Sequence, residues 1–459
     1  MEPHSNLDDH RMEALIERYG NGVPRYTSYP TAPHFNESLA HVSYGELLDA
    51  IVPGEPISVY MHIPFCDRLC WFCGCNTKHT LKYDPVKTYV DHLLMELAAV
   101  RARLGFAPSV GHVHFGGGSP SFLSETDLAR LGDALRALFL LNDETEICIE
   151  IDPSDVGEET LRGLTALGVT RVSVGVQDFD EEVQAAINRP QTYKQTRHVI
   201  DAMRDAGVRS VNIDALYGLP LQTSARLQST IEQVIELSPD RIALFGYAHV
   251  PWVKKHQRMI HDEDLPDTRE RFQQARHAEK QLCDAGYVKI GIDHFAKPDD
   301  SMAIANAEGH LRRNFQGYTT DSCTVLLGLG GSSISQYPGG YVQNIVATSR
   351  YQETVSKGEP PVAKGMRFCV DDKVRAFIIN QLMCRFAISF EELRQAFGPV
   401  AEPYITEAEL IAAQDGDGLC EVDADGFYIT QEARALTRVV ASRFDAYFER
   451  SEMRFSKAV

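Results

Sequence analysis

The sequence predicts an α/β protein built on a parallel sheet and followed by a smaller, mostly helical region. Between about residues 57 and 250, an apolar strand-like run repeatedly ends in a polar or glycine-rich loop, and a helix-like stretch follows. Six such alternations indicate parallel strands joined by helices. From about Lys364 the pattern changes to helices with one short hairpin. Periodicity alone does not distinguish a barrel from an open sheet.

The strand candidates are, in order, residues 57–62, 112–115, 146–150, 171–176, 210–214 and 241–245. Helices are expected between them, for example over residues 86–104 and 127–140. Ser124, with Asp127 three residues on, has the spacing of an N-terminal cap for the second of these helices. Because parallel strands end at a common edge, the loops that follow them are where binding and catalytic groups gather.

A seventh strand is expected over residues 288–293, before a long segment rich in glycine and asparagine that extends to Gly340. Long loops in compact proteins usually carry function. Further on, helices are expected over 371–385, 390–396 and 431–448, and a hairpin over 419–430 turns at Asp-Gly. Helices with a terminal hairpin resemble a winged helix. DNA binding is disfavoured because residues 365–459 contain 11 Lys and Arg against 16 Asp and Glu.

Composition and charge argue against several classes of protein. The 459 residues are 44% hydrophobic and 24% charged, which is ordinary for a globular chain. No run of 18 apolar residues predicts a membrane span, and the first ten residues lack the apolar core of a signal peptide. Ten cysteines without such a signal argue against a disulfide scaffold, so a cytoplasmic location is expected. A net charge of −19 argues against nucleic acid or an anionic membrane as the main partner.

Four cysteines lie within ten residues of one another. Cys66, Cys70 and Cys73 have the spacing C-x3-C-x2-C, and Cys75 follows. Three thiolates on one short loop can hold three irons of an iron–sulfur cube and leave the fourth iron open for a ligand. A structural zinc site is the alternative, but it normally uses two separated Cys or Cys–His pairs. The spacing therefore favours a cluster on the first three cysteines, with Cys75 as a non-ligand.

A glycine triplet follows the second strand, in the run His114-Phe-Gly-Gly-Gly-Ser119. Three glycines allow the backbone to approach a ligand closely or to form an anion-binding nest. The run matches neither the dinucleotide-binding nor the P-loop signature. A flexible strand–helix turn is the alternative reading. Because the cysteine loop follows the neighbouring first strand, we favour ligand contact.

Polar residues end the next three strands. Glu150 ends the third, Gln177 the fourth and Asp214 the fifth, while Arg189 closes the helix after the fourth. Each is weak evidence alone, since a single carboxylate at a turn is usually solvated. Glu150 could accept hydrogen bonds from both hydroxyls of a ribose. Polar groups at the ends of successive parallel strands converge on one site.

Together these motifs resemble the radical S-adenosylmethionine (SAM) enzymes, whose hallmark is C-x3-C-x-aromatic-C after the first barrel strand. Within them, the chain resembles the oxygen-independent coproporphyrinogen III oxidases of haem biosynthesis. Three features narrow the resemblance: the extra cysteine in Cys73-Gly-Cys75-Asn76, the segment Pro-Arg-Tyr-Thr-Ser-Tyr-Pro at 24–30, and Asn-Phe-Gln-Gly-Tyr at 314–318. The resemblance extends from about residue 24 to the C-terminus.

The resemblance implies a [4Fe–4S] cluster on Cys66, Cys70 and Cys73, and two SAM molecules. The reaction it implies begins with reductive cleavage of SAM to a 5′-deoxyadenosyl radical. That radical takes hydrogen from two propionates of coproporphyrinogen III, which become vinyl groups of protoporphyrinogen IX. The positions that match the binding site of the cluster-bound SAM are Tyr60, Gly117, Glu150 and Ile334. Those that match the second SAM site are Phe72, Gly118, Ser119, Gln177, Arg189, Asp214 and Ala248. Tyr60, Cys75 and Gln316 match catalytic positions.

The fold implied by the resemblance is an incomplete (β/α)6 TIM-like barrel over residues 51–290. A substrate-covering arm is expected at 1–50, a connecting segment that contributes to the active site at 291–363, and a helical, winged-helix-like domain at 364–459. An electron-donor protein such as flavodoxin or ferredoxin and a monomeric state are also implied. A radical site must be shielded from water, and the arm and the C-terminal domain are the available covers.

The expected substrate carries four carboxylates, which need specific cations in so acidic a protein. Arg25, Arg312 and Arg313 are the candidates, although Arg312 and Arg313 could equally be surface residues. Two other readings stay open. One is a haem-binding chaperone related to these enzymes, which usually lacks the 24–30 segment and the fourth cysteine. The other is a zinc-stabilised binding module.

Overall fold

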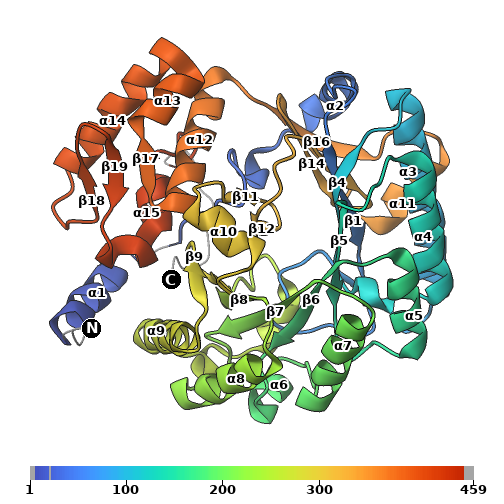
Figure 1. The fold of residues 1–459 in the computed structure, drawn as a ribbon, viewed down its shortest axis with the longest axis horizontal. Helices are drawn as coiled ribbons and strands as arrows, with labels where there is room; N and C mark the ends of the chain where they lie inside the picture. Colours follow the sequence, from blue (N-terminus) through green and yellow to red (C-terminus); the bar gives the residue numbers. More distant parts are fainter. Residues whose placement is uncertain (1–5, 20–21, 449–459) are drawn as a thin grey trace.

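The computed structural model describes residues 6–19 and 22–448, and its centre is the predicted parallel sheet (Figure 1). All six expected strands are present and pair in sequence order, each parallel to the next. They are β1 (Ile57–Ile63), β4 (Val110–Gly117), β5 (Glu146–Ile151), β6 (Arg171–Gln177), β7 (Ser210–Tyr217) and β8 (Arg241–Gly246). The predicted α/β class is therefore confirmed.

Further strands extend the sheet at both edges. On the side of β1, the parallel strand β13 (Leu326–Leu329) is followed by an antiparallel series, β14 (Ile334–Tyr337), β15 (Gly340–Asn344) and β16 (Val362–Arg367). On the side of β8 lie two short antiparallel strands, β10 (His294–Ala296) and β9 (Val288–Ile290). The outermost strands, β16 and β9, are not paired with each other in the described sheet. The sheet is thus a barrel that does not close, as the resemblance implied.

Two sequence expectations for this region were wrong. The strand expected over residues 288–293 ends at Ile290, because Gly291 adopts a left-handed conformation with φ of +55° and reverses the chain into β10. The glycine-rich segment up to Gly340 is not a loop. It forms β10, helix α10 (Ser301–Ala307), the hairpin β11 (Arg312–Asn314) and β12 (Gly317–Thr319), and the sheet strands β13 and β14. Its glycines mark turns and close strand contacts rather than disorder.

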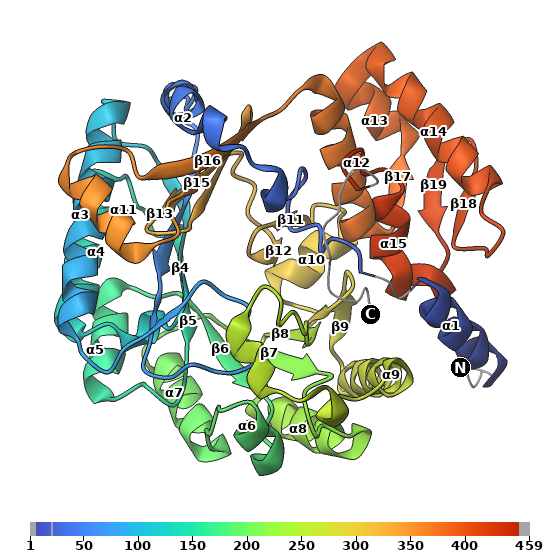
Figure 2. The ribbon, with the colours of Figure 1, turned by 180° about the vertical axis from the view of Figure 1, so that it is seen from behind.

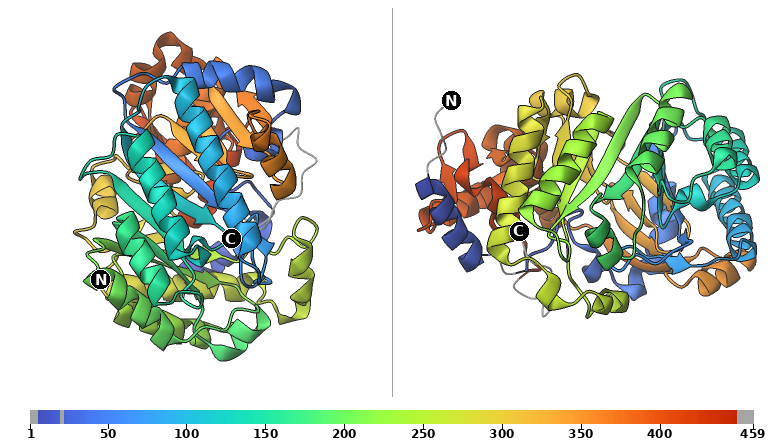
Figure 3. Two further views of the ribbon diagram at one scale, coloured as in Figure 1. Left: turned by 90° about the vertical axis from the view of Figure 1, so that its right-hand side faces the viewer. Right: turned by 90° about the horizontal axis from the view of Figure 1, so that it is seen from below.

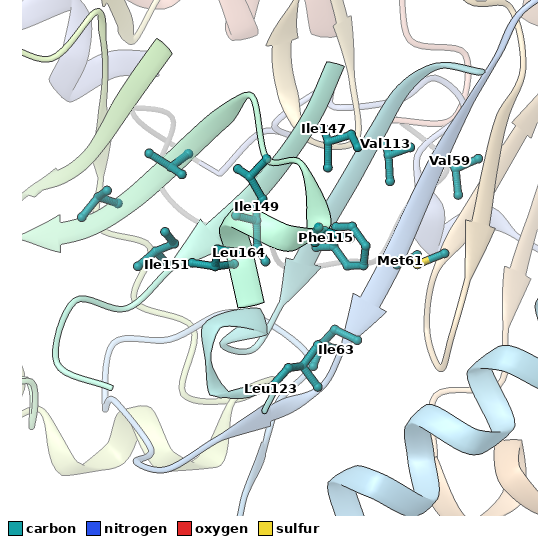
Figure 4. Close-up of a cluster of buried hydrophobic side chains, with 14 of the residues drawn as sticks. Val59, Met61, Ile63, Val113, Phe115, Leu123, Ile147, Ile149, Ile151 and Leu164 are labelled. Atoms are coloured by element: carbon teal, nitrogen blue, oxygen red, sulfur yellow. The ribbon is translucent and has the colours of Figure 1, made fainter. Parts of the chain in front are cut away.

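Helices cover the outer face of the sheet, as the side views show (Figure 3). They are α3 (Asp84–Leu104), α4 (Glu125–Leu138), α5 (Glu158–Leu167), α6 (Glu181–Ala186), α7 (Tyr193–Asp205), α8 (Ser224–Leu237) and α9 (Thr268–Asp284). The predicted cap is confirmed, since the Asp127 N–H donates to Ser124 Oγ at 3.2 Å. Val59, Met61, Phe115 and Ile149 point outward from the strands into a buried core with these helices (Figure 4). Because strand residues alternate, Tyr60, His114 and Glu150 face the inside of the barrel.

The N-terminal part of the core contains a buried carboxylate that joins four segments. Glu96 of α3 accepts hydrogen bonds from the Gly330 N–H at 2.7 Å, from Tyr351 of α11 (Thr348–Ser356) at 2.6 Å and from Asn344 at 2.6 Å. Burial raises the pKa of Glu96 from 4.5 to about 7, although these hydrogen bonds oppose the shift. The folded state therefore holds a proton on Glu96 at pH values where the unfolded chain does not.

The raised pKa of Glu96 predicts how the stability of the protein changes with pH. As pH rises from about 4.5 through 7, the free energy of unfolding should fall by on the order of 3 kcal/mol because the ionised Glu96 is disfavoured in the folded state. In the Glu96→Gln variant this fall with pH should be absent. Urea unfolding of the wild type and the variant from pH 5 to 8 measures the two free energies of unfolding. If they changed with pH in parallel, Glu96 would not have a raised pKa.

The C-terminal region has the predicted winged-helix-like arrangement. Helices α12 (Val370–Arg385), α13 (Phe390–Phe397) and α14 (Glu402–Ala413) pack beside a small antiparallel sheet of β17 (Ala387–Ser389), β19 (Gly426–Ile429) and β18 (Cys420–Val422). Helix α14 was missed, since Gly398, Pro399 and Pro403 suggest a loop, yet Pro403 lies in the first turn, where proline is tolerated.

The helix expected over residues 431–448 was wrong. A 3₁₀ turn at Glu432–Leu436 and the short α15 (Thr437–Ser442) take its place. Phe444 is fully buried and Asp445 accepts a hydrogen bond from Tyr26 at 3.0 Å, so the last described residues follow tertiary contacts rather than helix periodicity.

The N-terminal segment links the two halves of the molecule. Helix α1 (Asn6–Tyr19) packs against the C-terminal region, and α2 (Ala40–Asp49) packs against β15 and β16 (Figure 2). Between them the chain passes from the C-terminal region to the barrel, where Arg25 Nη2 donates to Gly246 O at 3.0 Å. Residues 1–5 and 20–21 of the expected arm and residues 449–459 of the expected C-terminal domain lie outside the described residues. Across the described helices, none combines the length and apolar character that crossing a bilayer requires.

Candidate functional site

The cysteine loop leaves the carboxyl end of β1 and is held at both ends. Its start and finish pair as the two-residue parallel strands β2 (Phe65–Cys66) and β3 (Lys78–His79). The Trp71 N–H donates to Ile187 O at 2.9 Å, and Asn188 Nδ2 donates to Leu69 O at 2.9 Å. The middle of the loop is thereby fixed to the segment after α6.

Three side chains from the segment after β8 hold the other side of the loop. Gln257 Nε2 donates to Phe72 O at 2.8 Å and to Ala248 O at 3.2 Å. A ring nitrogen of His256 lies 2.7 Å from Cys73 O, and Lys254 Nζ donates to Cys75 O at 2.9 Å. Sequence reasoning singled out none of these three, because their role depends on a contact across the barrel mouth. Through Gln257, Phe72 and Ala248, two expected SAM positions, lie beside each other at the barrel mouth.

The thiols of Cys66, Cys70 and Cys73 influence one another electrostatically. Burial, and then the neighbouring sulfurs of Cys73 and Cys70, raise the pKa of Cys66. Burial also raises the pKa of Cys70, while Arg189, whose Nη1 lies 3.5 Å from Cys70 Sγ, opposes it. Three thiols gathered on one fixed loop are a donor set that fits a [4Fe–4S] cluster with one open iron.

Cys75 differs from the other three cysteines because it donates hydrogen bonds to one of them, Cys73. Its backbone N–H donates to Cys73 Sγ at 3.4 Å, and its thiol also hydrogen-bonds to that sulfur, which lowers the pKa of Cys73 to about 6. The hydrogen bond to Cys73 and the charge of that sulfur raise the pKa of Cys75, and burial and the Glu150 carboxylate add to the shift. Cys75 is exposed and acts in this structure as a hydrogen-bond donor to the Cys73 sulfur.

The barrel interior brings several expected site residues onto one face. Tyr60 pairs with His114 on β4 and with Gly328 on β13, and a Cβ on Gly328 would lie 2.7 Å from Ile334 O. Farther round the sheet, Glu150 pairs with Ser173 and Asp214 pairs with Gly175. Laterally paired residues point to the same side of a sheet. Tyr60, Ile334, Glu150 and Asp214 therefore share the inner face below the cysteine loop.

Glu150 occupies the centre of that face. It accepts hydrogen bonds from the Gly117 N–H at 3.1 Å and from His114 Nε2 at 3.3 Å. Burial alone would raise the pKa of Glu150, but these donors and the neighbouring histidines lower it below its ordinary value. Burial, together with the Glu150 charge, raises the pKa of Asp214 to about 6. The two carboxylates thus have different affinities for protons.

Two histidines that the sequence analysis did not single out complete the face. His62 Nδ1 lies 3.1 Å from Tyr60 Oη, and His62 Nε2 lies 3.0 Å from Asn76 O, so His62 ties the cysteine loop to the barrel. His114 stacks on Tyr60 with ring centroids 5.8 Å apart. Both follow the every-second-residue alternation of their strands, a signal that could have identified them from sequence.

The glycine triplet is used differently from the expected anion nest. The N–H of Gly118 donates to Ile63 O at 2.8 Å, that of Ser119 donates to Phe65 O at 2.8 Å, and that of Gly117 donates to Glu150. These amides are therefore occupied within the protein. A side chain at Gly117, where φ is +118°, would lie 2.5 Å from the His62 ring. The glycines allow close packing of β4 on the cysteine loop, and their contact with a ligand stays a prediction.

Arg189 connects the cysteine loop to the ends of β5 and β6. Its Nη1 is 2.9 Å from Asp152 Oδ2, and its Nη2 donates to Gly175 O at 2.7 Å. Gln177, at the end of β6, has a φ of 66°, a strained conformation for a residue other than glycine. Ser119 Oγ donates to Asp155 at 2.6 Å. Arg189 and Ser119 therefore adjoin the cysteine loop, and their part in a second SAM site stays a prediction.

The expected catalytic and substrate residues outside the barrel lie in different surroundings. Arg25 and Arg313 both lie near Asp293, and Arg313 lies over the Tyr318 ring at 4.6 Å. Arg312 is exposed, donates to Ser322 O at 3.0 Å and lines, together with Arg313, a cavity of about 760 Å³ beside α12. Gln316 is exposed in the β11–β12 turn. Arg312 and Arg313 thus line one cavity, and of the two it is Arg313 whose charge acts on Arg25.

Comparison with known proteins agrees with this arrangement. Residues 60–234 match the Radical SAM superfamily, and residues 370–436 match the HemN C-terminal domain. The chain is 45% identical to an oxygen-independent coproporphyrinogen III oxidase of Cereibacter sphaeroides, over 95% of this chain and 96% of that protein. It is 42% identical to one of Pseudomonas aeruginosa, over 99% and 100%. The structure of HemN from Escherichia coli, a radical SAM enzyme, superposes with a TM-score of 0.88 at 37% identity, covering 95% of this chain and 98% of that one. The chain therefore belongs to the oxygen-independent coproporphyrinogen III oxidase family of radical SAM enzymes.

Proposed function

We propose that the protein converts coproporphyrinogen III to protoporphyrinogen IX without oxygen, in the cytoplasm and as a monomer. In each of two rounds, a propionate loses a hydrogen atom to the 5′-deoxyadenosyl radical, its carboxylate leaves as carbon dioxide, and one electron passes to an acceptor. A vinyl group remains. Near-complete alignment with relatives of that name supports the proposal.

The chain's own residues would divide the work as follows. Cys66, Cys70 and Cys73 would hold a [4Fe–4S] cluster, which supplies the electron that cleaves SAM. Tyr60, Gly117, Glu150 and Ile334 would position the SAM at the cluster. The residues proposed for the second SAM are Phe72, Gly118, Ser119, Gln177, Arg189, Asp214 and Ala248. Tyr60, Cys75 and Gln316 are proposed to be catalytic. An electron-donor protein such as flavodoxin or ferredoxin would reduce the cluster.

The observation that carries the proposal is the position of three grouped thiols above a polar barrel interior. The loop is fixed on both sides by Asn188 and Gln257, and Glu150 lies beneath it with a lowered pKa. A carboxylate kept ionised can accept hydrogen bonds from ribose hydroxyls. The geometry therefore supports a SAM-binding chamber at this end of the barrel.

Anaerobic turnover with coproporphyrinogen III is the direct test. We expect SAM to be consumed, 5′-deoxyadenosine to be released and protoporphyrinogen IX to form in the reconstituted, reduced enzyme. Stable haem binding without decarboxylation would instead favour the chaperone reading. A colourless protein that binds zinc and no iron would overturn both.

A Cys75→Ser variant tests the separation of Cys75 from the three proposed ligands. Because Cys75 donates a hydrogen bond to Cys73, serine should keep that bond and the variant should keep its iron. Turnover of coproporphyrinogen III should fall by about 100-fold or more if the thiol itself takes part in proton or hydrogen transfer, as general acids and bases contribute at least that much. Iron content and product formation are the two measurements. Loss of iron in proportion to activity would make Cys75 a ligand.

A further inference from the structure

A cluster of guanidinium groups surrounds one buried carboxylate beside the barrel mouth. Arg438 Nη2 lies 3.2 Å from Asp293 Oδ2, and the other oxygen, Oδ1, lies 2.8 Å from His294 Nδ1. Arg25 and Arg313 are close enough for the Asp293 charge to act on both. Asp293 is 7% exposed, whereas all three arginines are partly accessible. The arginines are therefore more accessible to solvent than the carboxylate.

The three arginines come from parts of the chain that are far apart in sequence. Arg25 belongs to the N-terminal segment, Arg313 to β11, and Arg438 to α15 of the C-terminal region. Asp293 lies between β9 and β10 at the edge of the main sheet. Three segments thus meet at one point, and all three contribute a positive charge.

Among the described residues, neither Arg25 nor Arg313 forms an ion pair with a carboxylate of its own. Arg25 donates to a neutral carbonyl, Gly246 O, at 3.0 Å. Arg313 lies over the Tyr318 ring at 4.6 Å, and its Nε and Nη1 are buried without a hydrogen-bond partner in the described structure. A buried guanidinium with unused donors is costly unless an anion supplies the missing acceptors. The cluster is therefore incomplete as an internal ion-pair network.

We propose that Arg25, Arg313 and Arg438 form a carboxylate subsite for a propionate of the tetrapyrrole that does not react, and that the C-terminal region completes the substrate site through Arg438. This inference rests on the proposed function. Guanidinium groups match the planar geometry of a carboxylate and can bind it bidentately. In the protein without substrate, Asp293 is the counter-ion of these arginines and competes with a substrate carboxylate for them.

The position of the subsite agrees with this role. Arg25 contacts Gly246, two residues before Ala248, and Ala248 shares the Gln257 side chain with Phe72 of the cysteine loop. The subsite therefore lies at the same barrel mouth as the proposed SAM chamber. A macrocycle carrying several carboxylates could place one of them among the arginines while another faces the cluster.

Binding of coproporphyrin III, the fluorescent oxidised form of the substrate, to the anaerobic holoenzyme is the test. We expect Arg438→Gln to weaken its affinity by about 10- to 100-fold, the usual size of a lost hydrogen bond to a charged group. Iron content and SAM binding should not change. Arg434→Gln is the matched control, since Arg434 precedes Arg438 by one helical turn but lies over the Phe386 ring at 4.7 Å. It should bind as the wild type does.

Asp293→Asn should not weaken porphyrin binding, in contrast to Arg438→Gln. Removing the internal competitor leaves the arginines available, so affinity for coproporphyrin III should be equal to or above that of the wild type, and the porphyrin should restore thermal stability lost in the free variant. If Arg438→Gln does not fold, Arg438→Lys takes its place in the test. It should weaken binding of coproporphyrin III because lysine lacks the bidentate fork of arginine.

Equal porphyrin affinity in the wild type and the Arg438 variant would overturn the inference, as would weaker binding in Asp293→Asn. Failure of the proposed function looks different, because the wild type itself would then not convert coproporphyrinogen III.

Discussion

Replacing any one of Cys66, Cys70 or Cys73 with alanine should abolish the cluster and the activity together. Each thiol is fixed by a loop that is anchored on both sides, so a neighbouring residue cannot move into the vacant position. Loss of groups that merely support a metal ligand costs about 10- to 100-fold in affinity, and loss of a ligand itself should cost more than 100-fold. Iron analysis, absorbance and release of 5′-deoxyadenosine measure the effect.

Cys148→Ala is a suitable control for these variants. Cys148 is a buried residue on the inner face of β5 and pairs with His114, so it lies in the same barrel but not on the loop. It should keep its iron. If Cys70→Ala also kept a full complement of iron and released 5′-deoxyadenosine at the wild-type rate, the ligand set would be wrong.

The central sheet could be predicted because its signal is local. Each of the six parallel strands is an apolar run between clear breaks, and β1 and β4–β8 all match their expected ranges within a few residues. The edges could not be predicted in the same way. Strand β13 is only four residues long and pairs with β1, which lies more than 260 residues earlier, so nothing in its own sequence indicates a parallel partner. The last described residues, up to 448, follow the burial of Phe444 rather than their helical periodicity.

In the candidate site too, some residues could be predicted from the sequence and others could not. Cys66, Glu150 and Gln177 stand at or next to the ends of strands, where a parallel sheet places functional groups, and they could be selected from the sequence. Asp214 is expected at a strand end too, but β7 continues to Tyr217. Lys254 and Arg438 contact the site from distant segments, and neither belongs to a motif. The glycine triplet shows the limit of motif reasoning, since its amides bond within the protein rather than forming an open nest.

Glu150→Gln should lower the affinity for SAM by about 30- to 1,000-fold, which corresponds to about 2–4 kcal/mol for charge-assisted hydrogen bonds to ribose hydroxyls. Glutamine keeps the shape of the side chain but removes the charge, and its amide N–H₂ would face either Gly117 N–H or His114, which now donate to the carboxylate. Because the pKa of Glu150 is lowered, the wild type should retain its affinity as pH falls to about 5, and the variant should differ from it throughout that range.

Glu146→Gln separates this effect from the general loss of a barrel carboxylate. Glu146 is on the same strand and the same face, but it lies at the opposite end of the barrel, where it pairs with Arg171. That variant should lose stability and keep its affinity for SAM, because breaking a buried ion pair costs folding energy without touching the cysteine loop. Calorimetric titration of SAM into the reconstituted proteins, with thermal unfolding in parallel, distinguishes the two. Equal losses of SAM affinity in both variants would mean that the inner face acts as a whole and that Glu150 has no specific contact with the ribose.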